Sequence, residues 1–342
     1  MFKTKHILYV IVFVLVAILL IRRWNRPEGF SSIGKETIFI SCASYRDIAC
    51  SQTIEEIYSK ASDPSRVYVG ICEQNNDDST ESCTRDSMAG LYQDNIRKKN
   101  IPYTEAKGPT YARYLCSTLY NGETYFMQID SHSKFEQNWD TIIIEQWKEL
   151  HDTYGVQKPV LSNYPASQDA EKNSQVPVIC RSSFNEDSIP TFISVLKDPK
   201  PNGEYYPTPF ASGGFLFMKG LEVKFDPNLP HLFTGEEILY SARLYSHGYD
   251  IYAPRVNILY HHYERKGHAK FWEDIKDYKQ IQQDTLVRVR YLLKIAPDVP
   301  TGVYAKDMDR YGMGSQRSVE DYFNFASIDI ANKVSTSEQK FC

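Results

Sequence analysis

The chain has 342 residues, of which 42% are hydrophobic, so it can form one large α/β domain or two small ones. Its formal net charge of -4 gives no global positive field for polyanions. Lys and Arg occur only in short clusters. These features exclude a disordered chain and a nucleic-acid partner.

An uninterrupted apolar run occupies residues 7–21, with two lysines before it and three arginines after it. It is shorter than the roughly 20 residues of a full membrane span, but no small-residue cleavage pattern follows it. We therefore predict an uncleaved transmembrane signal anchor at residues 7–23 instead of a cleaved signal peptide. The predicted localisation is a single-pass, type II membrane protein of the Golgi or secretory pathway. The basic residues do not fix which side of the membrane holds the large domain.

The seven cysteines include no C-x-x-C pair, which argues against zinc ribbons and thioredoxin-like chemistry. An odd number leaves at least one thiol unpaired within the chain. Cys42 lies inside an apolar strand pattern and is expected to pack as a small hydrophobic residue. The others could form disulfides in an oxidising compartment.

Four short apolar runs in the first half of the chain read as strands, with helical patterns between them: residues 37–41, 66–72, 101–106 and 124–130. Alternating strands and helices predict an α/β fold with a mostly parallel central sheet flanked by helices. Ligands of such sheets bind beyond the carboxyl ends of the strands. The polar loops 44–47 and 130–132 follow two of these ends.

The second half is less regular. Residues 165–206 are polar and hold five prolines, so we expect a long excursion with a short strand at residues 191–195. The other predicted elements are a helix at 138–154, a strand at 159–163, an ordered segment at 210–217, a helix at 236–247, a strand at 249–253, and a C-terminal helix with a polar tail.

The sequence Asp130-Ser131-His132 directly follows an apolar strand. A carboxylate and an imidazole two residues apart can point into one cleft and hold a divalent cation such as Mn²⁺. A bound cation would neutralise the charge that develops on a departing diphosphate. Taken alone, the aspartate could equally cap the next turn.

Three further groups favour chemistry at this edge of the sheet. Arg113, on a helix that begins after Gly108-Pro109, could bind an anionic donor. Gly213 and Gly214 allow a substrate to approach the main chain. Glu236 and Glu237 could contact sugar hydroxyls or orient an acceptor, although glutamates in the first turn also stabilise a helix.

His261 and His262 follow a predicted strand. Either could complete the metal site that Asp130 and His132 begin, and the sequence does not decide between them. A histidine pair is otherwise more often structural.

Seven blocks of sequence, in this order, resemble the N-acetylglucosaminyltransferases that include the enzyme modifying hydroxyproline on the Skp1 subunit of ubiquitin ligases. The blocks are residues 38–47, 66–71, 108–113, 128–132, 211–215, 235–237 and 261–265, and the likeness covers roughly residues 36–275. A more distant resemblance is to the polypeptide N-acetylgalactosaminyltransferases, which also have an Asp-Ser-His sequence.

The resemblance implies a GT-A fold, a UDP-sugar donor, Mn²⁺ or another divalent cation, and retention of anomeric configuration. It implies that Asp130 and His132 bind the metal, with His261 or His262 as a third ligand. The donor would be bound by Ser44, Tyr45, Arg46, Asp47, Arg113, Asp130, Gly213 and Gly214. We expect Tyr45 to stack near the uracil, and Glu236 or Glu237 to take part in catalysis.

We therefore predict a metal-dependent transferase that moves GlcNAc from UDP-GlcNAc to a Ser, Thr or hydroxyproline hydroxyl of a polypeptide. The alternatives are another UDP-sugar, a glycan acceptor, or an inactive sugar-nucleotide-binding protein. The predicted domains are a tail (1–6), a signal anchor (7–23), a stem (24–35), a catalytic domain (36–285) and a C-terminal extension (286–342).

Overall fold

The computed structural model describes residues 36–76, 79–85, 91–169, 174–264 and 268–342. Thr37–Cys342 form one compact unit. The predicted tail, signal anchor and stem fall at residues 1–35, outside the described part of the chain. No helix within the described ranges is long and apolar enough to cross a membrane.

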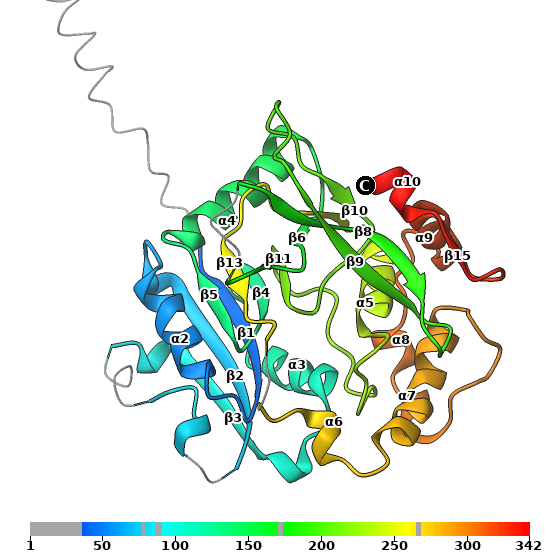
Figure 1. Cartoon of the computed structure of the whole chain (residues 1–342), viewed down its shortest axis with the longest axis horizontal. Coiled ribbons are helices and arrows are strands. Elements are labelled where there is room, and N and C mark those ends of the chain that lie inside the picture. Colours follow the sequence, from blue (N-terminus) through cyan, green and yellow to red (C-terminus); the bar gives the residue numbers. More distant parts are fainter. Residues whose placement is uncertain (1–35, 77–78, 86–90, 170–173, 265–267) are drawn as a thin grey trace, which may run out of the picture. The chain divides into compact units, whose positions relative to one another are not determined.

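An eight-stranded mixed sheet forms the centre of the unit, in the order β10-β12-β6-β11-β4-β1-β2-β3 (Figure 1). Four of its seven pairings are parallel, which confirms the prediction of an α/β fold with a largely parallel sheet. The strands are β1 (Ile38–Tyr45), β2 (Val67–Asn75), β3 (Ile96–Pro102), β4 (Tyr125–Asp130), β6 (Pro159–Ser162), β10 (Pro207–Thr208), β11 (Phe215–Lys219) and β12 (Asp250–Tyr252).

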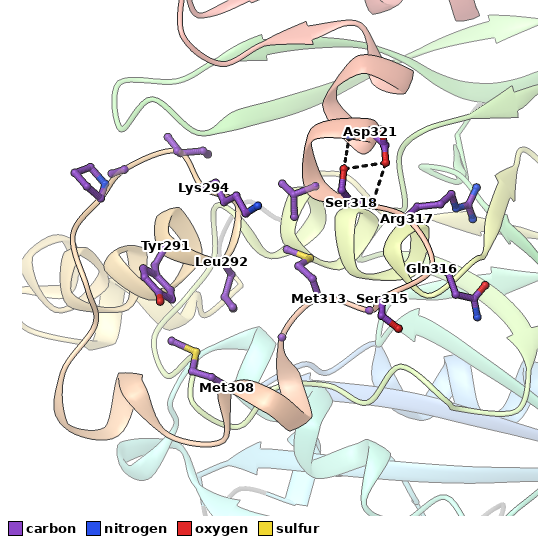
Figure 2. Close-up of a pocket in the computed structure, with 16 residues that line it drawn as sticks. Tyr291, Leu292, Lys294, Met308, Met313, Ser315, Gln316, Arg317, Ser318 and Asp321 are labelled. Atoms are coloured by element: carbon purple, nitrogen blue, oxygen red, sulfur yellow. Dashed lines mark hydrogen bonds between the residues drawn. The ribbon is translucent and has the colours of Figure 1, made fainter.

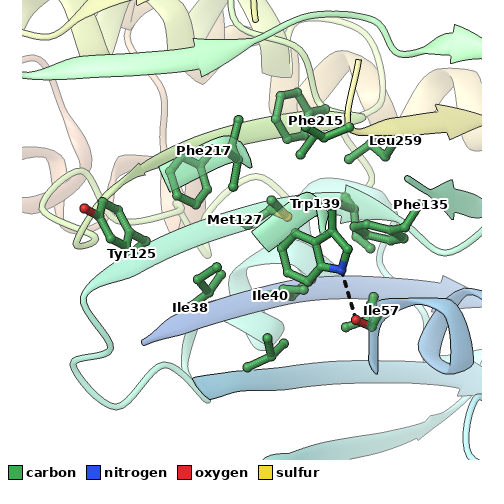
Figure 3. Close-up of a cluster of buried hydrophobic side chains, with 14 of the residues drawn as sticks. Ile38, Ile40, Ile57, Tyr125, Met127, Phe135, Trp139, Phe215, Phe217 and Leu259 are labelled. Atoms are coloured by element: carbon green, nitrogen blue, oxygen red, sulfur yellow. Dashed lines mark hydrogen bonds between the residues drawn. The ribbon is translucent and has the colours of Figure 1, made fainter. Parts of the chain in front are cut away.

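The middle strands are apolar because both faces of the sheet are covered. On one face, side chains from β1, β4 and β11 pack around Trp139, as Figure 3 shows. The indole Nε1 of Trp139 donates a hydrogen bond to the carbonyl oxygen of Ile57 at 3.0 Å. This bond satisfies the polar atom that a fully buried tryptophan brings into a core.

Nine α-helices occur in the described residues: α2 (Cys50–Ser59), α3 (Pro109–Ser117), α4 (Trp139–Lys148), α5 (Glu236–Ser246), α6 (Phe271–Asp274), α7 (Tyr278–Leu292), α8 (Met308–Tyr311), α9 (Val319–Ala326) and α10 (Ser337–Phe341). Helix α3 begins with a proline at its first position, after Gly108 with a φ of 86°. Glycine tolerates this left-handed conformation and proline fits the first turn, so this sequence fixes where α3 starts.

A second hydrophobic cluster joins α5, α7 and α9 and includes Leu239, Leu286 and Tyr322. The boundary that we placed after residue 285 therefore falls inside α7. The C-terminal segment packs against the same core as the preceding helices and belongs to the same compact unit.

Two element predictions were wrong. The third strand lies at Ile96–Pro102 instead of 101–106. This strand was not recognised because it contains Arg and Lys residues. It is an edge strand, and edge strands commonly carry charged side chains. The excursion at 165–206 contains a long antiparallel hairpin, β8 (Val176–Phe184) with β9 (Pro190–Lys197). The strand expected at 191–195 is confirmed, because it lies within β9, and β8 is the strand that was not predicted. Prolines concealed this hairpin, and they are tolerated there because it lies outside the main sheet.

A small second sheet lies beside the large one and has the order β5-β13-β7. Its strands are β5 (Ser133–Phe135), β13 (Leu259–His261) and β7 (Ala166–Ser167). β5 begins three residues after the end of β4, so this sheet starts where the predicted metal ligands lie.

Two disulfides connect Cys50 with Cys83 and Cys180 with Cys342. Cys42, Cys72 and Cys116 are buried and free, and Cys42 packs in the main core as its strand pattern predicted. The first disulfide joins the start of α2 to the segment that follows β2.

We expect the double variant Cys50→Ala/Cys83→Ala to be about 2–4 kcal/mol less stable than the wild type, because the bond closes a long loop in the unfolded chain. Guanidinium denaturation without reductant measures this, with Cys180→Ala/Cys342→Ala as the comparison. An unchanged free energy of unfolding would show that the bond does not stabilise the fold.

Candidate active site

Three strands place the candidate site at one edge of the large sheet. Asp130, the last residue of β4, pairs with Ala43 of β1. On the other side of β4, Ile129 pairs with Phe215, the first residue of the antiparallel strand β11. The end of β4 and the glycines that precede β11 therefore meet at the carboxyl ends of the parallel strands, where ligands of such sheets bind.

Asp130, His132 and His261 form a cluster in which one ligand atom from each residue lies within 4.8 Å of the others. His261 reaches the cluster because β13 pairs with β5, which sets His261 opposite Ser133. Its Nε2 lies 3.2 Å from Oδ2 of Asp130. The centroids of the two imidazole rings are 4.5 Å apart.

His262 does not join this cluster. Its backbone N–H donates to the carbonyl oxygen of His132 at 3.1 Å. Its imidazole contacts the side-chain amide of Gln168. Successive residues of an extended chain point to opposite sides, so only one of two adjacent histidines can face Asp130. Of the two residues that the sequence left open, the structure brings His261 to the candidate metal site.

Asp47 lies behind His132 and is almost fully buried, with 1% of its surface exposed. Its Oδ2 lies 2.7 Å from Nδ1 of His132 and accepts a hydrogen bond from the hydroxyl of Ser131 at 2.7 Å. A carboxylate that accepts from Nδ1–H leaves the lone pair of Nε2 free for a metal. We predicted Asp47 as a donor-binding residue, but its carboxylate is turned to His132. Ser44 is also fully buried.

Arg113 joins the cluster to helix α5. Its Nη2 donates to Oδ1 of Asp130 at 3.0 Å, and its Nη1 donates to the carboxylate of Glu236. The hydroxyl of Thr110 donates to the same Glu236 oxygen at 3.0 Å. Glu236 is thus held by two residues of α3, and its carboxylate positions Arg113.

These contacts set the charges at the cluster. Burial alone would raise the pKa of Asp130, but its hydrogen bond to His261 and the Arg113 guanidinium hold the pKa well below its usual range. Burial would lower the pKa of Arg113, but the carboxylates of Glu236 and Asp130 raise it. The negatively charged carboxylate of Asp130, a candidate metal ligand, therefore lies beside the positively charged guanidinium of Arg113.

Gly213 and Gly214 are required by close packing. A Cβ atom on Gly213 would lie 2.8 Å from Nη1 of Arg113, and one on Gly214 would lie 3.2 Å from Oδ2 of Asp130. The side-chain amide of Gln128 donates to the carbonyl oxygen of Gly213 at 2.7 Å and fixes this peptide. The glycines thus let the main chain lie directly against the charged residues.

Glu237 faces the same space from the first turn of α5. Its Oε1 accepts a hydrogen bond from the Gly213 N–H at 2.8 Å, and its Oε2 accepts one from the hydroxyl of Tyr164. Burial raises the pKa of Glu237 to about 7, because these hydrogen bonds offset only part of the desolvation. A carboxyl group with this pKa can take up or release a proton near neutral pH.

A cleft of about 340 Å³ opens over these residues. Seven of the predicted site residues line it: Arg113, Asp130, Gly213, Gly214, Glu236, Glu237 and His261. Tyr164 and Tyr263 also line it and were not predicted. Tyr164 could have been suspected, because it comes two residues after β6, at another strand end. Tyr263 is placed by a hydrogen bond from its hydroxyl to the carbonyl oxygen of Pro165 at 2.7 Å.

Tyr45 and Arg46 are not among the residues that line the cleft. The hydroxyl of Tyr45 donates to Asp274 at 2.7 Å, and its ring packs edge-on against Phe271 of α6. Arg46 forms ion pairs with Glu81 and Asp274. The two predicted donor residues thus connect the loop after β1 to α6 in this structure.

A more voluminous groove of about 970 Å³ lies between α7 and α9, with Met308, Met313 and Arg317 among its lining residues (Figure 2). The cluster of His and acidic residues that could hold a metal lies elsewhere. The chemistry of the side chains, and not the volume, therefore locates the candidate site in the smaller cleft.

The family model described as Glycosyltransferase (GlcNAc) matches residues 37–90 and 84–332. The chain belongs to this glycosyltransferase family. It is therefore an enzyme of the glycosyltransferase class, as predicted. A comparison with curated protein sequences finds no match.

A solved structure has a similar fold. The crystal structure of GalNAc-T7 with UDP, GalNAc and Mn²⁺ superimposes with a TM-score of 0.54 at 11% identity, over 85% of this chain and 57% of that one. Staphylococcus aureus TarS 1–349 in complex with UDP-GlcNAc gives a TM-score of 0.49 at 11% identity, over 89% of this chain and 77% of that one. The likeness to GalNAc-T7 shows that the mixed α/β architecture of this chain is similar to the fold of that protein.

The candidate metal ligands of the glycosyltransferase suit a divalent cation. One carboxylate and two imidazoles are a mixed O and N set that suits Mn²⁺ and similar metals. Asp47 holds His132 in the form that a metal needs. Nδ1 of His261 is buried and has no hydrogen-bond partner within the described ranges, whereas its Nε2 faces Asp130 at 3.2 Å. Asp130, His132 and His261 are therefore the residues that could hold the cation.

The raised pKa of Glu237 predicts a pH-dependent stability. The folded protein binds this proton more tightly than the unfolded chain, so the stabilisation is complete below about pH 4.5 and is lost as the pH rises through about 7. Relative to Glu237→Gln, the wild type should lose stability between pH 5 and pH 8. Urea denaturation at four pH values measures the difference, with the exposed Glu145→Gln as control. A difference independent of pH would contradict the raised pKa.

Proposed function

We propose that this glycosyltransferase uses UDP-GlcNAc and a divalent cation, preferably Mn²⁺, to transfer GlcNAc to a hydroxyl group. The observation that carries the proposal is the cluster of Asp130, His132 and His261 at the edge of a cleft that also holds Arg113 and Glu237. The family of the chain and the ligands named for GalNAc-T7, which are UDP, GalNAc and Mn²⁺, support the same reading.

In this proposal Asp130, His132 and His261 hold the cation. When bound, the cation neutralises negative charge on the leaving diphosphate. Arg113 keeps Asp130 ionised and in place, and Glu236 in turn keeps Arg113 aligned. The three residues of the cluster therefore act through an ion-pair network that extends to α5.

Glu237 is the candidate for direct contact with the reacting groups. In the transfer, the bond from C1 of the sugar to the diphosphate oxygen breaks, a bond from C1 to the acceptor oxygen forms, and the acceptor hydroxyl loses its proton. A carboxyl group in the cleft with a pKa of about 7 can accept that proton or a hydrogen bond from a sugar hydroxyl. Retention of anomeric configuration remains a proposal from the family resemblance.

Two acceptor classes are proposed. The resemblance to the hydroxyproline-modifying enzymes favours a Ser, Thr or hydroxyproline hydroxyl of a polypeptide. A glycan acceptor is favoured by a different observation, an exposed pair of aromatic rings beside the cleft. An inactive sugar-nucleotide-binding protein is the third reading, and binding of UDP without turnover would support it.

The location is also a proposal. Two disulfides favour folding in an oxidising compartment, as in the secretory pathway. Together with the apolar run at residues 7–21, they support a type II membrane protein whose catalytic unit faces the lumen. Alkylation of free thiols in the native chain, before and after reduction, would report whether the disulfides form.

The adjacent histidines give a matched pair for testing the metal site. We expect His261→Ala to reduce Mn²⁺-dependent release of UDP from UDP-GlcNAc by about a hundredfold or more, since a metal ligand is lost. His262→Ala should stay within about threefold of wild type, because its ring faces Gln168. Equal losses in the two variants would contradict the assignment. A folded wild type that neither binds UDP nor releases it would contradict the enzyme proposal.

We expect Asp47 to strengthen metal binding by positioning His132, without contacting the metal itself. Asp47→Asn cannot accept the Nδ1–H hydrogen bond as a charged group, so the Kd for Mn²⁺ should rise by roughly 10- to 100-fold. Isothermal titration with Mn²⁺ in the presence of UDP measures this. Asp274→Asn, which contacts Tyr45 and Arg46 and not the cluster, is the control. The same Kd in Asp47→Asn and wild type would show that Asp47 does not position His132.

A further inference from the structure

A second groove of about 780 Å³ continues from the cleft across the surface of α6 and α7. Phe233 and Thr234 line both spaces, so they form the border between them. A molecule bound in the groove would therefore lie next to the candidate active site. In Figure 1, α6 lies next to α3, which carries Arg113, and α7 follows α6 on the side away from α3.

Two aromatic rings are exposed at this border. Phe233 is 51% exposed and Trp272 is 40% exposed, and their ring centroids lie 4.9 Å apart at an interplanar angle of 59°. Large exposed aromatic rings next to a cleft mark a binding surface more often than isolated apolar residues do. The rings are also large, rigid surfaces against which a ligand can pack.

Buried neighbours fix the backbone segments that carry the two rings. Phe271, next to Trp272, is 5% exposed and packs against Tyr45, His231 and Tyr278. Oε1 of Gln282 accepts hydrogen bonds from the backbone N–H of Phe233 at 3.1 Å and from the hydroxyl of Tyr278 at 2.8 Å. The segments that carry Phe233 and Trp272 are thus ordered before a ligand binds, which lowers the entropic cost of binding.

The other residues that line the groove indicate which class of ligand it favours. Among the described residues that line the groove, Glu186, Asp187 and Asp277 bring three carboxylates, against one ammonium group from Lys279. This balance disfavours anionic ligands, whereas carboxylates accept hydrogen bonds from hydroxyl groups. Ile275 is the one aliphatic residue in the described part of the lining, so these residues offer little to an aliphatic side chain. A pyranose ring fits these features, because it has an apolar C–H face and several hydroxyl groups.

We propose that this groove is the acceptor subsite and that it binds a neutral sugar ring, stacked on Trp272 and Phe233, so that a hydroxyl of the acceptor glycan reaches the cleft. The inference rests on the proposed glycosyltransferase function and favours its glycan acceptor over an unmodified polypeptide.

The test measures transfer of radiolabelled GlcNAc from UDP-GlcNAc to a library of neutral oligosaccharides and to unglycosylated Ser- and Thr-containing peptides. Trp272→Ala should raise the KM for the neutral glycans about 3- to 10-fold, because one aromatic contact with the sugar ring is lost. This rise should exceed any change in the KM for UDP-GlcNAc. Trp272→Phe keeps a ring and should restore most of the affinity. Tyr291→Ala is the control, since Tyr291 is also 40% exposed but lies outside the groove.

Three results would overturn the subsite: labelled peptides without labelled glycans, no labelled product from the glycan library, or an unchanged glycan KM in Trp272→Ala. A failure of the proposed glycosyltransferase function would give a different result. In that case the wild type would release no UDP from UDP-GlcNAc with Mn²⁺, with or without an acceptor.

Discussion

Arg113 bridges two carboxylates that come from distant parts of the chain, and the arrangement of the cleft depends on this bridge. Asp130 belongs to the central sheet and Glu236 to helix α5, and the guanidinium of Arg113 forms an ion pair with each carboxylate. Removing this shared cation would leave two largely buried acidic groups without their partner, which is strongly destabilising. The bridge also explains Gly213, because a side chain at that position would displace the guanidinium. The glycosyltransferase thus holds its candidate metal ligand Asp130, the main chain at Gly213 and the first turn of α5 together through one buried charge.

The elements around this bridge were largely predictable. β1, β2 and β4 are buried on both faces, so they stand out as apolar runs, and the polar residues after them are conspicuous. Asp130 and His132 could be identified as candidate metal ligands for that reason. Arg113, Gly213 and Glu237 were proposed from the helix start, the glycine pair and the paired glutamates. The order of the family blocks then supported them, since each of these residue types is common on any surface.

Contacts between distant segments could not be predicted. The choice between His261 and His262 is made by the register of β13 against β5, a pairing across more than a hundred residues. The role of Asp47 depends on where the loop after β1 meets His132. The β8–β9 hairpin was missed because its prolines and polar residues resemble a loop, and only its pairing partner reveals the strand. These features follow from tertiary register, which local patterns do not encode.

The central claim is that Asp130, His132 and His261 together hold the cation of this glycosyltransferase. Anomalous diffraction from crystals of the Thr37–Cys342 unit soaked with Mn²⁺ and UDP tests it most directly. A manganese peak in contact with all three side chains, and absent from crystals of His261→Ala, is the predicted result. A peak at another position, or UDP bound in the cleft with no metal beside these residues, would contradict the claim.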